Sequence, residues 1–100
     1  MTLPVFSSTK DGTSRKLVAV QAAAFDFMPT MILCPLVPAA EGLATDARVR
    51  VSFEGADYLA YCDLPRSIST KALVKIGFIE PAASNQILET VHDLIEWPER

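Results

Sequence analysis

The feature that most constrains the fold is one change in the period of the hydrophobic residues along the chain. From Ala47 onward the apolar residues Val49, Val51 and Phe53 alternate with polar ones. Side chains of a β-strand alternate between two faces, so this spacing predicts a strand with one buried face. Near the C-terminus the apolar residues recur instead at helical spacing, at Ile87, Leu88, Val91, Leu94 and Ile95. We therefore expect a mostly β chain that ends in one helix.

The other apolar runs are short, and polar residues, glycine or proline separate them. They lie at residues 3–7, 16–21, 31–37, 57–62 and 73–79. Polar residues 7–14, which include Asp11-Gly12, read as a hairpin loop, and Glu54-Gly55 as a tight turn. Residues 38–46 form a connection with room for one helical turn. Together these segments predict about six strands.

Prolines refine the expected boundaries. Pro35 lies inside the third run and argues for a strand end or a bulge there. Pro81 is placed as a first-turn helix residue, while Ser84 or Asn85 could cap a slightly later start. Pro98 forbids much extension of the helix. A helix of about four turns would then cover one side of the sheet.

The composition predicts one domain that spans residues 1–100. The chain has 100 residues, of which 50% are hydrophobic, so it can bury one modest core without metals or disulfides. Its net charge of −3 gives no long-range attraction to phosphate or to an anionic membrane, so nucleic acid is not the default partner. No apolar run approaches the roughly 20 residues of a membrane span, and residues 1–9 lack a signal-peptide pattern. We expect a cytoplasmic protein.

Side chains that could bind a metal are scattered. Cys34 and Cys62 lie in apolar stretches with no second ligand at metal spacing, so we expect buried reduced thiols. Asp57 and Asp63 flank one strand without a third ligand, and His92 reads as a partly exposed surface residue on the helix. We predict no metal and no cofactor.

Two arginines, Arg48 and Arg50, project from the polar face of the 47–53 strand. They could bind a phosphate, but two arginines on such a face more often only keep it solvated, and that is our expectation. No glycine-rich phosphate loop, Ser-His-Asp set or Cys-His pair can be assembled from the chain.

Several strings resemble a known toxin family. Residues 14–21, followed after a loop by residues 32–36, resemble the R-x-x-V-x-V-Q and V-I-P-L strands of CcdB toxins, and the final helix runs into Trp97 as theirs does. Residues 62–68 resemble instead the C-D-Q-P-R-T-I string of the PemK/Kid and MazF ribonucleases. The resemblance implies the fold of this superfamily, a small SH3-like antiparallel β-barrel or sheet with a C-terminal helix, and a homodimer.

The CcdB branch is the favoured interpretation. It implies a non-enzymatic toxin that binds the DNA gyrase A subunit and traps the cleaved gyrase–DNA complex, without direct binding of nucleic acid. By position, Trp97 would be the stacking anchor, with Glu96, Pro98 and Asp93 beside it. A large indole at a rigid helix end suits such an interface. The chain departs from the pattern at residues 98–100, where a Gly-Ile end is expected.

The alternative is a sequence-specific MazF-like endoribonuclease with RNA as its substrate. Cleavage through the 2′-hydroxyl of RNA needs a base and a cation. The resemblance puts Asp63 in the acidic place of an Arg-x-Asp pair, but Tyr61 stands where the arginine belongs. Arg66 could substitute if the turn folds back. The long N-terminal loop of the ribonucleases is absent.

A second alternative is a non-toxic dimeric module that only binds its antitoxin. The resemblance implies that the tail of a cognate antitoxin covers exposed parts of residues 7–15 and 38–46. The residues expected to contact it are Ser8, Lys10, Asp11, Arg15 and Glu41. Because the chain itself is acidic, apolar contacts are expected to outweigh charge in that complex.

Overall fold

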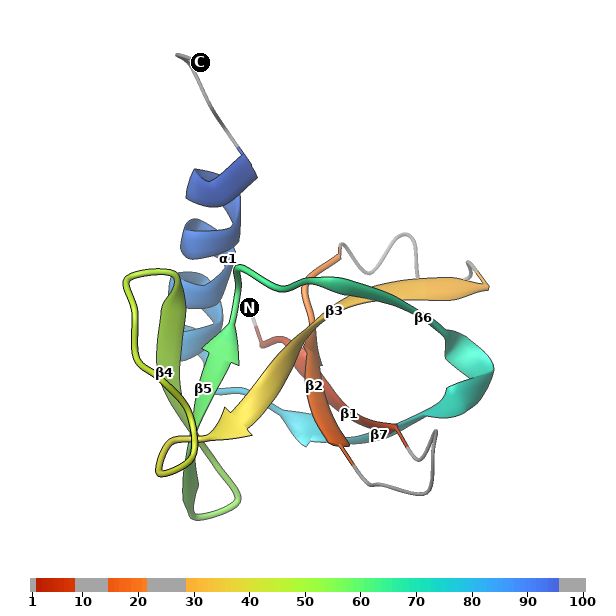
Figure 1. The fold of residues 1–100 in the computed structure, drawn as a ribbon. Coiled ribbons are helices and arrows are strands. Elements are labelled where there is room, and N and C mark those ends of the chain that lie inside the picture. The colour runs from red at the N-terminus through yellow and green to blue at the C-terminus, as the bar shows by residue number, and fades with distance from the viewer. Residues whose placement is uncertain (1, 9–14, 22–28, 96–100) are drawn as a thin grey trace.

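The computed structural model describes residues 2–8, 15–21 and 29–95, and Figure 1 shows their arrangement. Seven strands and a short 3-10 helix precede one long α-helix. In chain order these are β1 (Pro4–Ser8), β2 (Arg15–Ala19), β3 (Thr30–Pro38), β4 (Arg48–Phe53), β5 (Ala56–Tyr61), β6 (Arg66–Ser69), η3 (Thr70–Ala72), β7 (Leu73–Phe78) and α1 (Pro81–Ile95). The prediction of a mainly β chain with a C-terminal helix is confirmed.

All seven strands belong to one antiparallel sheet. Its order is β4-β5-β3-β2-β1-β7, and β6 pairs with the N-terminal part of β3. The sheet curls strongly, with α1 beside β4 and β5 at one end and β6 with η3 at the other (Figure 1). Among the described strands β4 and β7 do not pair, so the sheet is open and is not a closed barrel.

Strand β6 was not expected from the sequence. Its four residues read RSIS and are mostly exposed, so they carry no clear apolar pattern. The strand exists because it pairs with β3, from Thr30 opposite Ser69 to Leu33 opposite Arg66. Long-range hydrogen bonding, rather than local preference, decides this element.

The prediction of a strand end or bulge at Pro35 is wrong. Pro35 lies inside β3, directly opposite Leu17 of β2. On the other edge β3 pairs with β6 up to Leu33 and with β5 from Leu36. Pro35 thus falls between two partners, where its missing N–H interrupts neither ladder.

The two connections around β4 agree with the sequence prediction. Phe53 and Ala56 are paired, and Glu54 and Gly55 between them have φ angles of 50° and 81°. Positive φ at both positions is the mark of a type I′ turn, so the predicted tight turn is confirmed. Within residues 38–46 the Gly42 N–H donates to the Pro38 carbonyl at 3.1 Å, an i to i+4 bond that closes one helical turn, and no helix longer than this turn lies there.

The core lies in two clusters. The main cluster fills the space between the sheet and α1, and it contains Val49, Val51 and Phe53, so the predicted buried face of this strand is confirmed. A second cluster contains Phe6, Leu17, Ala19, Met31 and Leu33. Gly77 of β7 lies so close to Phe53 that an added Cβ would be 2.9 Å from its ring, which shows how tightly the two ends of the sheet approach.

Helix α1 begins at Pro81, as predicted, and a later start at Ser84 or Asn85 is wrong. Ser84 is fully buried inside the first turns, and its hydroxyl accepts the Leu3 N–H and donates to the Ile79 carbonyl, both at 3.0 Å. The side chain therefore joins the N-terminal segment to the start of the helix. Among the described residues no helix has the length and apolar character to cross a membrane.

We predict that Ser84→Ala lowers the free energy of unfolding by about 1–3 kcal/mol, because it leaves the buried Leu3 N–H without an acceptor. Ser52→Ala, at an exposed position of β4, is the matched control and is expected to change little. Urea denaturation followed by circular dichroism measures both. Equal stabilities of the two variants would contradict the role of Ser84.

Candidate functional site

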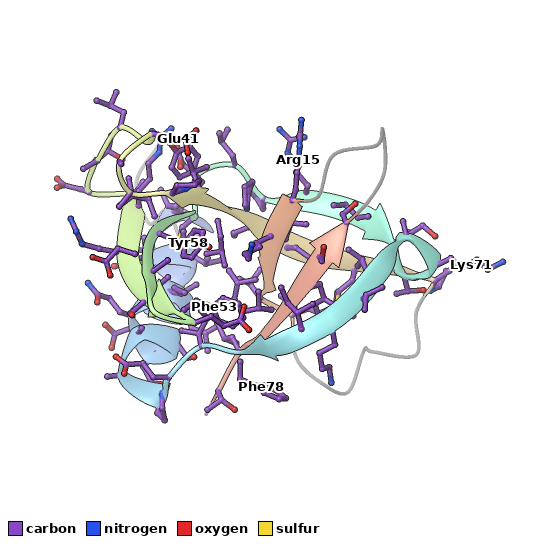
Figure 2. All side chains as sticks on the ribbon, turned by 90° about the horizontal axis from the view of Figure 1, so that it is seen from below. Arg15, Glu41, Phe53, Tyr58, Lys71 and Phe78 are labelled. Carbon is purple, nitrogen blue, oxygen red and sulfur yellow. The ribbon has the colours of Figure 1, made fainter. Side chains whose placement is uncertain are left out.

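A groove of about 1250 Å³ is lined by residues of β1, β2, β3, β5 and β6. Three basic residues, Arg15, Lys16 and Arg66, contribute to its lining, as do Tyr58 and Tyr61. The described residues that line it include no Asp or Glu. Figure 2 labels Arg15 at the start of β2 and Tyr58 on β5. The groove is thus locally basic although the chain carries a net charge of −3.

The aromatic side chains of the groove lie near cations. The Lys16 Nζ is 5.8 Å from the centroid of the Tyr58 ring. The guanidinium carbon of Arg48 is 3.8 Å from the centroid of the Tyr61 ring, close enough for stacking. Leucines and prolines of β2 and β3 complete the lining, so the groove offers apolar, aromatic and positively charged groups together.

A cluster around Arg48 lies beside this groove. The Arg48 Nε and Nη2 donate to the two carboxylate oxygens of Asp63 at 3.2 and 3.3 Å, and Nη1 donates to the Leu43 carbonyl at 2.8 Å. The hydrogen bonds that Arg48 donates to Asp63 raise the pKa of Arg48 above its usual value. Only 15% of the Arg48 side chain is exposed. The expectation of a merely solvated arginine is therefore wrong at this position.

The second arginine of the strand behaves as expected. The Arg50 Nη2 donates to the Asp57 Oδ2 at 2.9 Å, and the two side chains are 69% and 54% exposed. Such an exposed pair contributes little to stability. Both arginines are matched by an aspartate, so the phosphate-binding pair considered for Arg48 and Arg50 is not formed.

Of the two predicted ribonuclease residues, Asp63 lies in the turn after β5 and Arg66 is the first residue of β6, and no ion pair joins them. Asp63 follows β5, and its carboxylate binds Arg48. Arg66 opens β6 and lines the groove, and among the described residues it takes part in no ion pair. Arg66 therefore does not replace the missing partner of Asp63. The guanidinium that contacts Asp63 is that of Arg48.

The sequence contained a signal for this cluster that was not used. A two-residue turn at Glu54 and Gly55 fixes the register of β4 against β5 and puts Arg48 directly opposite Tyr61. Asp63 follows Tyr61 by two residues, so the register of the hairpin predicts that the side chains of Arg48 and Asp63 can meet.

The residues predicted to bind gyrase lie mostly outside the described part of the chain. Glu96, Trp97 and Pro98 are among them, so the structure does not test their role. Asp93 is exposed near the end of α1, and His92 beside it is exposed as predicted.

The residues predicted to bind the antitoxin are divided. Lys10 and Asp11 lie outside the described residues. Ser8 and Arg15 are paired across β1 and β2 and both line the groove, but Ser8 is buried. Glu41 is exposed in the turn after β3 and does not line the groove. Of the described members, only Ser8 and Arg15 come together.

The two cysteines are free thiols in the main core, as predicted. A hydrogen bond between them, together with burial, raises the pKa of Cys34. A buried thiol with a raised pKa is a poor nucleophile. In the part of the chain that the structure describes, no three His, Cys, Asp or Glu residues gather into a metal site.

Comparison with known proteins identifies the fold. No protein-family model and no curated protein matches this chain. Among solved structures, the MazE–MazF complex of Deinococcus radiodurans is similar, with a TM-score of 0.79 and 14% identity over 92% of this chain and 90% of that chain. The toxin MazF-mt6 of Mycobacterium tuberculosis is also similar, with a TM-score of 0.73 and 17% identity over 94% and 99% of the two chains.

A third similar structure is a mycobacterial endoribonuclease in complex with its cognate antitoxin. It has a TM-score of 0.75 and 17% identity, and the match covers 95% of each chain. None of these three is a CcdB protein. The chain has the fold of the MazF toxins, which is the fold that the resemblance of its sequence to the CcdB/MazF superfamily implied.

Proposed function

We propose that this protein is the toxin of a toxin–antitoxin pair and that it cleaves RNA as an endoribonuclease. The observation that carries the proposal is the basic groove together with Asp63, which lies in the chain between the groove-lining residues Tyr61 and Leu64. The fold supports it, since similar structures include MazF toxins and an endoribonuclease bound to its antitoxin. We thus prefer the MazF-like endoribonuclease interpretation of the sequence to the CcdB-like gyrase-poison interpretation.

RNA suits the chemistry of the groove. Arg15, Lys16 and Arg66 offer positive charge to the phosphates. Tyr58 and Tyr61 offer aromatic surfaces on which unpaired bases can stack, as in many proteins that bind single strands. Because the chain is acidic overall, attraction must come from these local groups rather than from the field of the whole protein.

Cleavage follows from a base and a cation placed at one phosphate. The Asp63 carboxylate accepts the proton of a ribose 2′-hydroxyl while the 2′-oxygen attacks the adjacent phosphorus. The bond from phosphorus to the 5′-oxygen breaks, and this oxygen takes a proton from a water molecule, which regains one from the protonated Asp63 carboxyl. Arg66 stabilises the negative charge on the phosphoryl oxygens. The products are a 2′,3′-cyclic phosphate and a free 5′-hydroxyl, and no metal takes part.

The partners follow from the same proposal. We infer a homodimer and a cognate antitoxin whose tail covers the groove, as suits a chain similar to a MazF that is in complex with MazE. Arg15 and the apolar side chains of the groove are available for such a tail. With RNA as the substrate, the protein acts in the cytoplasm.

The CcdB-like interpretation is less well supported. Its main residues, Glu96, Trp97 and Pro98, lie outside the described chain, and no contact among the described residues favours a gyrase interface over another use of Asp93. The similar structures reported above are not gyrase poisons by name. Endonucleolytic cleavage of RNA is therefore preferred.

We predict that Asp63→Asn lowers the rate of RNA cleavage by about 10²–10⁴-fold, because the amide cannot accept the proton. The assay uses a 5′-labelled RNA on a denaturing gel. Asp57→Asn is the matched control, since it also removes an aspartate paired with an arginine of β4. Trp97→Ala is expected to keep the activity.

A parallel tube with gyrase, supercoiled plasmid and ATP tests the other interpretation. We expect the plasmid to remain unlinearised after detergent and protease. Linear plasmid together with intact RNA would overturn the proposal and restore the gyrase poison.

We also predict that Arg66→Ala makes RNA binding less dependent on salt. Loss of one phosphate contact to a single strand reduces the slope of log K against log salt by about 0.7. A 2′-deoxy oligonucleotide, which cannot be cleaved through its 2′ position, is the ligand in a fluorescence titration. Arg50→Ala is the control and should leave the slope unchanged, since Arg50 does not line the groove. Equal slopes for both variants would place the RNA elsewhere.

A further inference from the structure

We propose that Arg48 is the positioning residue of the RNA-cleaving site and that it orients the Asp63 carboxylate from the neighbouring strand. The inference rests on the proposed ribonuclease function and adds a residue to that site. The arginine that the family pattern places two residues before the acid is a tyrosine in this chain. The geometry supplies the guanidinium from across the hairpin instead.

The hairpin puts Arg48 where this role requires it. Arg48 opens β4 and Tyr61 closes β5, and the two residues are direct partners in the strand register. A side chain directly opposite lies about 5 Å away between Cβ atoms in an antiparallel pair. A long side chain at position 48 can therefore reach the same space as one at position 61, including the turn that carries Asp63.

The hydrogen bonds fix the carboxylate and not only its charge. Two nitrogens of one guanidinium contact the two oxygens of Asp63 at 3.2 and 3.3 Å. A two-point contact sets the direction of the carboxylate plane, which a single contact does not. A proton acceptor must be held close to one geometry to act on a bound hydroxyl.

The remaining contacts anchor Arg48 itself. Its Nη1 donates to the Leu43 carbonyl at 2.8 Å, and the Leu43 N–H donates to the Tyr61 hydroxyl at 3.3 Å. Three of its N–H groups are thus engaged, and the side chain is 15% exposed. Arg48 is poorly placed to bind a phosphate directly, so it acts through Asp63.

Tyr61 completes the arrangement. Its ring stacks against the guanidinium of Arg48 at 3.8 Å, and the same residue lines the groove. The ring therefore connects the Arg48–Asp63 pair to the groove in which the RNA is proposed to lie. A tyrosine at position 61 thus supports the arginine on the adjacent strand and does not abolish the cleavage site.

The neighbouring ion pair shows that these features are not general to the strand. Arg50 lies on the same strand face, yet it contacts Asp57 through one nitrogen, and both side chains are mainly exposed. Arg50 is thus a matched control for the loss of an arginine from β4.

The experiment compares four variants in the same RNA cleavage assay. Arg48→Ala is expected to lower kcat by about 100-fold with little change in KM, because the base is displaced but the groove is intact. Arg48→Lys keeps the charge but lacks the planar fork, so it should lose activity as well. Arg50→Ala should behave as the unchanged protein.

The exchange of the two partners is the sharpest variant. Arg48→Tyr together with Tyr61→Arg keeps the stacked pair. It moves the guanidinium to the end of β5, two residues before Asp63. We expect this double variant to recover kcat to within about 10-fold of the unchanged protein. Thermal unfolding of each variant shows that it is folded at the assay temperature. A purely structural effect of Arg48 would follow the melting temperature rather than the position of the guanidinium.

The outcomes distinguish failure of the Arg48 role from failure of the proposed function. If the unchanged protein cleaves RNA and folded Arg48→Ala keeps its kcat, the role of Arg48 is overturned and the proposed function stands. A folded exchange variant as slow as Arg48→Ala also overturns the role. If the unchanged protein does not cleave RNA, the proposed function and this inference fail together.

Discussion

The tight turn at Glu54 and Gly55 is the constraint on which the candidate site depends. Both residues have positive φ, so the turn holds two residues and no more, and the register of β4 against β5 is fixed. A slip of one residue would send Val49 and its neighbours away from the core and move Arg48 from Tyr61. The same turn therefore determines both which side chains of the hairpin are buried and which side chains contact each other on its exposed face.

Charge is distributed so that an acidic chain can still present a basic surface. Arg48 and Arg50 are each matched by an aspartate, whereas Arg15 and Arg66 line the groove without an acid in its described lining. Short-range contact with a phosphate depends on these unmatched groups more than on the net charge. The net charge of a small chain therefore does not describe the charge of its individual surfaces.

The sequence predicted the elements that local patterns determine. The alternation around Val51 and the helical spacing around Ile87 are strong periodic signals, and both elements formed as expected. Strand β6, the continuation of β3 through Pro35 and the buried bridge made by Ser84 depend on partners far away in the chain. Those contacts have no local signature, which is why they were missed or misassigned.

The candidate site shows the same limit in a sharper form. A motif describes residues in chain order, so Tyr61 two residues before Asp63 looked like a missing arginine. An acid, however, responds to the guanidinium that is nearest in space, and an antiparallel sheet puts the cross-strand partner as close as the residue two positions away. Here the guanidinium that contacts Asp63 comes from Arg48 on the adjacent strand, and it stacks on the ring of Tyr61. A substitution at a motif position therefore argues against a function only after its neighbours on the adjacent strand have been considered.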